Sequence, residues 1–263
     1  MQRFRQLLLM VTVTIVPFMS VHAGTAEEKG LAIAQEVDRN DQGWGDAAAS
    51  MEMVLRNRQG EESSRSIRIK FLEVNGDGDK SLTIFDNPRD IKGTAFLSFS
   101  HVINADDQWL YLPALKRVKR ISSANKSGPF MGSQFAYEDL ASFEVDKYHY
   151  KYLRDEKLND QETFVIENYP NYEHSGYSRQ IVWVDKQRYI PLKVEYYDRK
   201  DDLLKTLTFN NYKQYLDKYW RAHEQVMDNR QNGKTTVLTL SNYQFRIGLN
   251  DRNFDRNSLR RAR

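Results

Sequence analysis

Short segments in which apolar and polar residues alternate recur along most of this chain of 263 residues. One of them places Ile67, Ile69 and Phe71 on one side and Arg68 and Lys70 on the other, which is the period of a β-strand with one buried face. About ten or eleven such segments follow one another at hairpin spacing, which predicts an antiparallel meander. A single sheet of that width must curl to cover its apolar face. We therefore expect a mainly β (α+β) fold: one strongly curved antiparallel sheet forming an open half-barrel, with an N-terminal helix and a loop or helix lid.

Local signals define both ends of this sheet. Thr25–Asn40 predicts an amphipathic helix, because Thr25 and Glu28 have the spacing of a capping box and the apolar residues share one face. Asn232-Gly233 is a strong hairpin signal near the other end. The tail, residues 257–263, is interpreted as one short helical turn or a frayed end. The N-terminal helix and the loop after Ile121 are then the pieces free to plug the sheet.

Residues 1–23 have the features of a cleavable signal peptide. A basic start is followed by an apolar run over residues 7–19 and by a small-residue site that ends at Ala23. The competing interpretation is a membrane anchor, which needs roughly 20 apolar residues. We expect cleavage after Ala23, a periplasmic location and a single domain over residues 24–263. The chain contains no cysteine, so we expect neither lipidation after the apolar run nor a thiolate metal ligand.

The charge balance argues against nucleic acid as a partner. The chain has 39 Lys and Arg against 36 Asp and Glu, a net charge of +3. Cleavage would remove Arg3 and Arg5 and leave 37 against 36. Generic nucleic-acid binding needs a net basic field or a large basic patch, and a nearly neutral mature chain does not supply one.

No motif in the sequence nominates a catalytic or metal centre. Nucleophile elbows, P-loops and dinucleotide fingerprints are absent, and the four histidines after residue 23 are not paired at metal-ligand spacing. Asn75–Asp86 superficially resembles a calcium loop but is better interpreted as a hairpin turn, because Lys80 stands where that loop needs glycine. The acidic pairs Asp106–Asp107 and Asp201–Asp202 are interpreted as solvated carboxylates in turns. We expect no cofactor, no metal and no enzymatic activity.

The segment from Trp109 to Ser133 combines a strand, a basic run and a long loop. The run holds Lys116, Arg117, Lys119 and Arg120, which either protect an exposed strand edge or form a cationic rim for lipid headgroups or an acidic partner. The loop over residues 122–133 is long enough to suggest a function. Its apolar pair, Phe130 and Met131, either folds inward as core or covers an opening and moves when a ligand enters.

The stretch "DQWLYLPALKRVKRISSANKSGPFMGSQFAYEDL", residues 107–140, resembles the outer-membrane lipoprotein-sorting proteins of the LolA/LolB-like group. The preceding "DNPRDIKGTAFLSF", residues 86–99, fits the same family. The resemblance implies an open β-barrel whose helices close a hydrophobic cavity for acyl chains. It places six residues at this lipid-binding cavity or its lid: Trp109, Tyr111, Phe130, Met131, Phe135 and Tyr137. It places Arg117, Arg120 and Lys126 at the mouth, in contact with a headgroup or partner.

The resemblance also implies a function. The expected protein is a soluble periplasmic carrier that binds the acyl chains of a lipid or lipoprotein and passes them between envelope components. An inner-membrane lipid-exporting pump or an outer-membrane acceptor would be its partner. The alternative is a non-catalytic envelope module that docks a membrane transporter through the basic rim. A third interpretation, an enzyme on lipids or glycans, lacks any nucleophile and base that the sequence can nominate.

Overall fold

The computed structural model describes residues 24–261, and the predicted signal peptide lies outside them. One antiparallel sheet of thirteen strands dominates the fold. Two α-helices accompany it, α1 (Ala26–Asn40) and α2 (Arg256–Arg261). The strands are β1 (Asp46–Arg56), β2 (Glu62–Leu72), β3 (Lys80–Asn87), β4 (Ala95–Phe99), β5 (Asp107–Leu112), β6 (Arg117–Ile121), β7 (Tyr148–Leu158), β8 (Gln161–Pro170), β9 (Tyr177–Asp185), β10 (Pro191–Asp198), β11 (Leu203–Tyr215), β12 (Tyr219–Asn229) and β13 (Thr235–Phe245).

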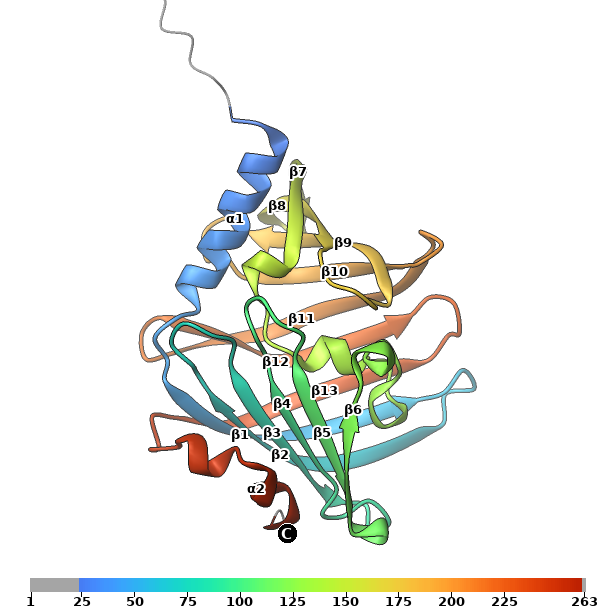
Figure 1. Cartoon of the computed structure of the whole chain (residues 1–263). Helices are drawn as coiled ribbons and strands as arrows, with labels where there is room; N and C mark the ends of the chain where they lie inside the picture. The colour runs from blue at the N-terminus through green and yellow to red at the C-terminus, as the bar shows by residue number, and fades with distance from the viewer. Residues whose placement is uncertain (1–23, 262–263) are drawn as a thin grey trace, which may run out of the picture.

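The sheet is two meanders joined along one seam. Strands β1 to β6 pair in sequence order, as do β7 to β13, and β1 pairs with β13. Strands β6 and β7 are therefore the two edges, and the sheet curves without closing (Figure 1). The predicted curved, open half-barrel is confirmed. The hairpin predicted at Asn232-Gly233 joins β12 to β13.

Helix α1 forms as its sequence predicts. The Thr25 hydroxyl accepts from the Glu28 amide at 3.1 Å, and the Glu28 carboxylate accepts from the Thr25 amide at 2.8 Å. This capping box satisfies amide groups that have no partner within the helix. The helix lies beside β7 (Figure 1). Neither α1 nor α2, the two α-helices in residues 24–261, is long and apolar enough to cross a membrane.

The segment between β6 and β7 fills part of the concave side. Its Phe130 is 1% exposed and packs against Phe85 and Phe96, with ring centroids 5.9 and 5.1 Å apart. Burying a phenylalanine side chain is worth about 1.5–3 kcal/mol. Of the two possibilities left open for Phe130, the structure shows the inward one. We call residues 122–147 the plug segment.

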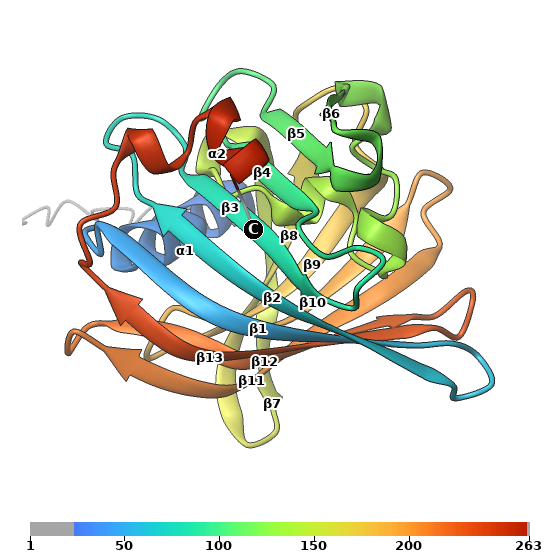
Figure 2. The ribbon, with the colours of Figure 1, turned by 90° about the horizontal axis from the view of Figure 1, so that it is seen from below.

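The convex side carries a second, smaller apolar cluster. Phe254 and Leu259 follow β13 and are almost fully buried against Leu97 and Trp109. Figure 2 shows α2 lying on the outside of the sheet over this region. The tail, interpreted as a short turn or a frayed end, is a helix through Arg261 that covers an outer face of the sheet.

Gly30 sets how closely α1 approaches the sheet. A Cβ atom at this position would lie 2.8 Å from the Tyr152 backbone nitrogen and 2.9 Å from Lys151 backbone atoms. Gly30→Ala would stabilise a free helix by about 1 kcal/mol. We expect it instead to destabilise this protein by about 1–3 kcal/mol, because the helix must move away from β7. Urea unfolding measures the change, and Gln35→Ala on the exposed face of α1 is the matched control. A stabilising Gly30→Ala would contradict the close contact.

A buried ion pair ties the plug segment to the sheet. Lys205 Nζ lies 2.6 Å from Asp139 Oδ2, and each side chain is 4% exposed. Asp139→Asn leaves the lysine charge buried without its counter-charge, so we expect a loss of about 3–5 kcal/mol of unfolding free energy. Chemical denaturation tests this, with Asp251→Asn at an exposed ion pair as the control expected within about 1 kcal/mol. A loss below about 1 kcal/mol for Asp139→Asn would show that the pair does not hold the plug.

Candidate functional site

A cavity of about 1570 Å³ lies between the concave face of the sheet, α1 and the loops at one end of the half-barrel. It exceeds the range of about 300–1,000 Å³ in which most small-molecule pockets fall. Its floor consists of inward-facing apolar side chains from β8 to β11: Ile166, Val182, Val184, Val194, Tyr196 and Phe209. Ala34 and Val37 of α1 also line the cavity.

Strand alternation explains why this floor is apolar. On β10, Val194 and Tyr196 point inward and are each less than a tenth exposed. Lys193 and Glu195 point outward, where their side chains form an ion pair at 2.6 Å. Because successive side chains face opposite sides of a strand, one short sequence supplies both a polar exterior and an apolar lining.

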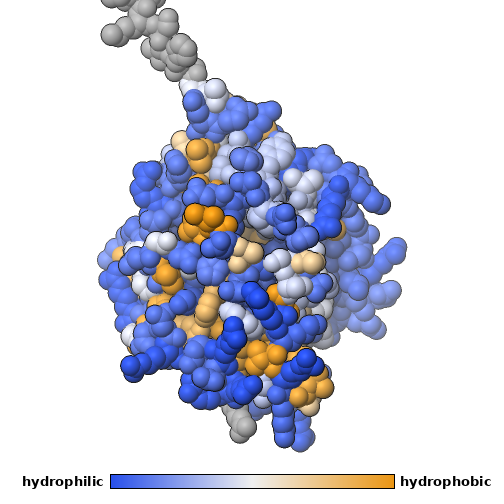
Figure 3. Space-filling model, viewed as in Figure 1, coloured by the Kyte–Doolittle hydropathy of each residue, from blue (hydrophilic) through white to orange (hydrophobic). Residues whose placement is uncertain are grey.

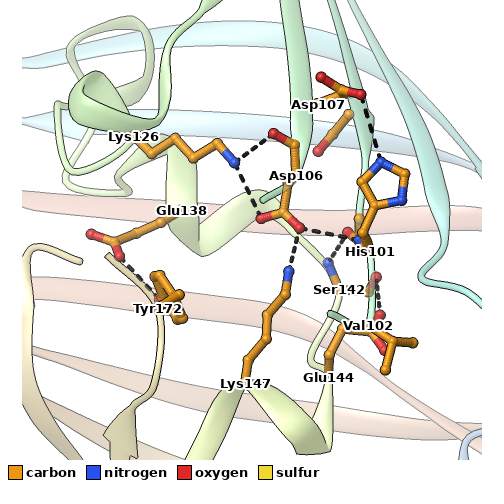
Figure 4. Close-up of polar contacts among 12 residues, drawn as sticks. His101, Val102, Asp106, Asp107, Lys126, Glu138, Ser142, Glu144, Lys147 and Tyr172 are labelled. Atoms are coloured by element: carbon orange, nitrogen blue, oxygen red, sulfur yellow. Dashed lines mark hydrogen bonds and ion pairs between the residues drawn. The ribbon is translucent and has the colours of Figure 1, made fainter. Parts of the chain in front are cut away.

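One carboxylate joins the loops at the mouth of the cavity. Lys126 Nζ donates to the Asp106 carbonyl at 2.6 Å and lies 3.6 Å from the Asp106 carboxylate. That carboxylate also pairs with Lys147 and accepts from the His101 amide at 3.2 Å. Figure 4 shows how Asp106 connects segments before β5, after β6 and before β7. Burial lowers the pKa of Lys126, and the Asp106 charge partly offsets this effect.

Asp106 corrects an expectation from the sequence. We interpreted Asp106 and Asp107 as solvated turn carboxylates, but the Asp106 side chain is 11% exposed and has two lysine partners. A buried carboxylate needs such partners, because an isolated one would be strongly destabilised.

The cavity lining is acidic overall. Eleven lining residues are Asp or Glu, whereas five are Lys or Arg. Burial raises the pKa of Asp79 to about 7, and repulsion from Glu144 and Glu73 adds to this shift. Burial also raises the pKa values of Asp38 and Glu144. Each charge therefore makes its neighbour harder to ionise, which is the behaviour of carboxylates that share a partly dry space.

A polar network lies at the mouth of the cavity, between the plug segment and the loop that joins β8 to β9. The Glu138 carboxylate accepts from Tyr172 Oη at 3.1 Å, Ser175 Oγ at 3.0 Å and the Gly176 amide at 2.8 Å. Burial raises the pKa of Glu138, and the nearby Asp139 charge raises it further. This network fixes the loop between β8 and β9 against the plug segment.

Trp109 and Tyr111 lie away from the cavity. Both side chains belong to the outer cluster beneath the C-terminal segment, and Arg256 stacks over the Trp109 ring at 4.9 Å. Inward and outward residues alternate along β5, so Leu110 points inward instead. A role for Trp109 and Tyr111 in binding cargo stays a prediction, but the structure does not place them at the cavity.

The four apolar residues predicted from the plug segment are brought together. Phe130 contacts Tyr137 with ring centroids 5.5 Å apart, and Phe135 and Met131 pack in the same core cluster. Arg65 donates to the Met131 carbonyl and holds this turn. None of the four is among the described residues that line the cavity. They pack in or against the main core cluster instead.

The three predicted basic residues occupy two different places. Lys126 lines the cavity at its mouth, and its contact with a headgroup or partner stays a prediction. Arg117 and Arg120 lie on the exposed edge strand β6, and Arg120 pairs with Asp107. Neither arginine is among the described residues that line the cavity.

Within residues 24–261, no group of three or more His, Cys, Asp or Glu side chains is placed to hold a metal ion. The floor on β9 and β10 is what sequence reasoning overlooked. The alternation of apolar and polar residues on these strands was visible in the sequence. Which part of the concave face stays uncovered, however, depends on where the plug segment lies.

Comparison with known proteins gives several matches. A family model described only as an uncharacterized protein matches residues 77–261, and no curated protein matches the chain. A domain from Vibrio parahaemolyticus assigned to the outer-membrane lipoprotein-sorting proteins is 64% identical. The match covers 89% of this chain and 99% of that one, with a TM-score of 0.88.

Two further solved structures share the fold. A DUF1329 family protein from Desulfovibrio piger is 30% identical, with 90% of this chain and 100% of that one covered and a TM-score of 0.85. A LolA superfamily protein from Nitrosomonas europaea is 23% identical over 90% of this chain and 100% of that one, with a TM-score of 0.69. The two more similar relatives agree with the curved, open half-barrel. This chain has the fold of the LolA superfamily protein, and it belongs to the family of the outer-membrane lipoprotein-sorting protein domain from Vibrio parahaemolyticus and the DUF1329 protein.

Proposed function

We propose that this protein is a periplasmic carrier that binds the acyl chains of a lipid or lipoprotein and passes them between envelope components. The observation that carries the proposal is the 1570 Å³ cavity with its apolar floor on β8 to β11. The 64% identical relative, assigned to lipoprotein sorting, supports the same class of cargo.

Burial in this cavity supplies the binding energy without a catalytic group. An acyl chain gains about 0.8 kcal/mol for each CH₂ group that leaves water. The floor residues Val182, Val184 and Val194 are less than a tenth exposed and are held by strand pairing on both sides. A rigid floor keeps the empty cavity from collapsing, so little of this energy is lost in ordering the protein.

The mouth determines how cargo enters and leaves. Its loops are held by Asp106 with Lys126 and Lys147, and Ile103 and Phe143 are exposed apolar residues on the lining. Figure 3 shows separate apolar patches on an otherwise hydrophilic face of the molecule. In this proposal, cargo passes between these loops, and an acceptor that buries more of the acyl chain drives its release.

The basic residues on and just before the edge strand β6 support the alternative role, which is docking to a membrane transporter. Arg117 and Lys119 are exposed on β6, and Lys116 is exposed just before it.

Charge reversal at Lys116, Arg117 and Lys119 separates the carrier role from the docking role. Crosslinks to envelope membrane proteins that disappear while acyl-probe binding is unchanged would favour docking as an additional role. Crosslinks that survive would exclude this rim as the docking surface.

Filling the cavity tests the carrier proposal. Val37 is half-buried and faces the cavity from α1, so Val37→Trp places an indole where acyl chains would lie. We expect the affinity for diphenylhexatriene, an uncharged hydrocarbon probe, to fall about tenfold or more, because several buried CH₂ contacts are lost. Fluorescence titration measures it.

Leu31→Trp is the matched control, because Leu31 lies on the same helix, is 39% exposed and is not among the lining residues. Circular dichroism should show both variants folded. Equal probe affinity for Val37→Trp, Leu31→Trp and the unchanged protein would refute binding in this cavity.

A further inference from the structure

Basic side chains gather on one outer region of the molecule. Residues 113–121, which form the turn between β5 and β6 and the strand β6 itself, contain four Lys or Arg and no Asp or Glu. Helix α2 contains three Arg and no Asp or Glu. We call these seven residues the basic face, and all are exposed: Lys116, Arg117, Lys119, Arg120, Arg256, Arg260 and Arg261. None of the seven is among the described residues that line the cavity.

Strand β5 brings the two parts of the basic face together. The strand register pairs Arg120 of β6 with Trp109 of β5, and Arg256 of α2 lies over the Trp109 ring, 4.9 Å from its centroid. Helix α2 contacts β4 and β5. Seen from below, α2 and β6 lie on the same side of the molecule (Figure 2). Two segments that are far apart in the sequence therefore contribute to one cationic surface.

Most charges of the basic face have no counter-charge. Of the seven residues, only Arg120 and Arg261 form ion pairs within residues 24–261. Protection of an exposed strand edge would explain the cations on β6. It does not explain Arg256 and Arg260, because α2 is not part of the sheet and has no strand edge to protect. Uncompensated cations on two neighbouring elements point to an anionic partner.

An exposed apolar residue stands at the tip of this region. Leu115 is 68% exposed in the turn between β5 and β6, and Lys116 and Arg117 follow it directly. At the surface of a lipid bilayer, acyl groups and headgroup phosphates lie close together, so an apolar side chain can insert while neighbouring cations stay at the headgroups. The long side chains of Lys and Arg reach those headgroups. The basic face therefore fits a bilayer surface better than the purely polar surface of an acidic protein.

The mouth of the cavity has the opposite charge. Its lining has eleven acidic and five basic residues. Strand β5 runs from Asp107, next to the mouth residue Asp106, to Leu112, which leads into the basic turn. The mouth and the turn are therefore separated by the length of β5, about 17 Å. An anionic bilayer attracts the turn and repels the mouth, and this asymmetry favours one orientation of the protein.

We propose that the basic face docks this protein on the surface of an anionic lipid bilayer, with Leu115 inserted among the headgroups and the cavity mouth directed away from the lipid. The partner is the lipid itself, so no membrane protein is needed. This inference goes beyond the proposed carrier function and does not depend on it, because no residue of the docking surface lines the cavity.

Cosedimentation with protein-free vesicles at low salt tests the docking. We expect the purified protein to bind vesicles with about 30% phosphatidylglycerol in phosphatidylcholine at least about tenfold more tightly than vesicles of phosphatidylcholine alone, because one cation near an anionic membrane strengthens binding about fivefold. Salt at about 1 M should remove this difference. Equal binding to both kinds of vesicle, or no binding to the anionic ones, would overturn the proposal.

Charge reversal assigns the binding to the basic face. Lys116→Glu, Arg117→Glu and Lys119→Glu together should weaken binding to the anionic vesicles by about a hundredfold, and Arg260→Glu alone by about fivefold. The binding of diphenylhexatriene should not change, because these residues do not line the cavity. Unchanged vesicle binding by Arg260→Glu would exclude α2 from the docking surface.

The matched control reverses three exposed cations in other turns. Arg58, Lys200 and Lys234 form no ion pair within the part of the chain that the structure describes. Arg58→Glu, Lys200→Glu and Lys234→Glu together change the net charge as much as the triple variant on β6 does, but should weaken vesicle binding less than about fivefold. An equal loss in both triple variants would reveal a general effect of net charge and overturn the basic face as the docking surface.

Single-site labelling tests the orientation, because the chain contains no cysteine of its own. Leu115→Cys and Leu216→Cys are each labelled with the fluorophore NBD. Leu216 is 43% exposed in the turn between β11 and β12 and is not among the described lining residues. On anionic vesicles, NBD emission should rise and shift to the blue at residue 115 and stay unchanged at residue 216. No response at residue 115, or an equal response at residue 216, would overturn the proposed orientation.

Discussion

An antiparallel sheet that curves but does not close leaves one apolar face that the chain must cover from within. Here β1 pairs with β13 and joins two meanders into thirteen strands, while β6 and β7 remain as edges. Curvature brings the inward side chains of distant strands toward one another. The segments that cover the concave face of the sheet therefore determine whether the protein has a solid core or a binding site.

The plug segment divides the concave side into two parts. Over β1 to β5, Phe130 and its neighbours pack against Phe85 and Phe96 and form a solid core. Over β8 to β11, the same alternation of side chains faces a space that the plug segment borders but does not fill. The buried pair of Lys205 and Asp139 fixes the boundary, because it ties the plug to β11 beside the cavity wall. One continuous sheet thus supplies both a packed core and the floor of a cavity.

Sequence patterns predicted the local structure well because their causes are local. The capping box of Thr25 and Glu28, the strand alternation and the Asn232-Gly233 hairpin depend on near neighbours. The position of the site depends on distant contacts. Trp109 looks like a cavity residue in isolation, but Phe254 and Leu259, which come more than a hundred residues later, cover it on the convex face. The acidic mouth was missed for the same reason, since its carboxylates come from α1, the β2–β3 turn and the plug segment.

The proposed carrier function depends most on whether acyl chains occupy the cavity over β8 to β11. Mass spectrometry of organic extracts from protein purified out of its native envelope tests this most directly. The carrier proposal predicts acyl-bearing lipid or lipoprotein in a near-stoichiometric amount, which is lost when the protein is unfolded and washed before extraction. Folded protein that carries no acyl chain above the level of a control envelope protein would contradict it.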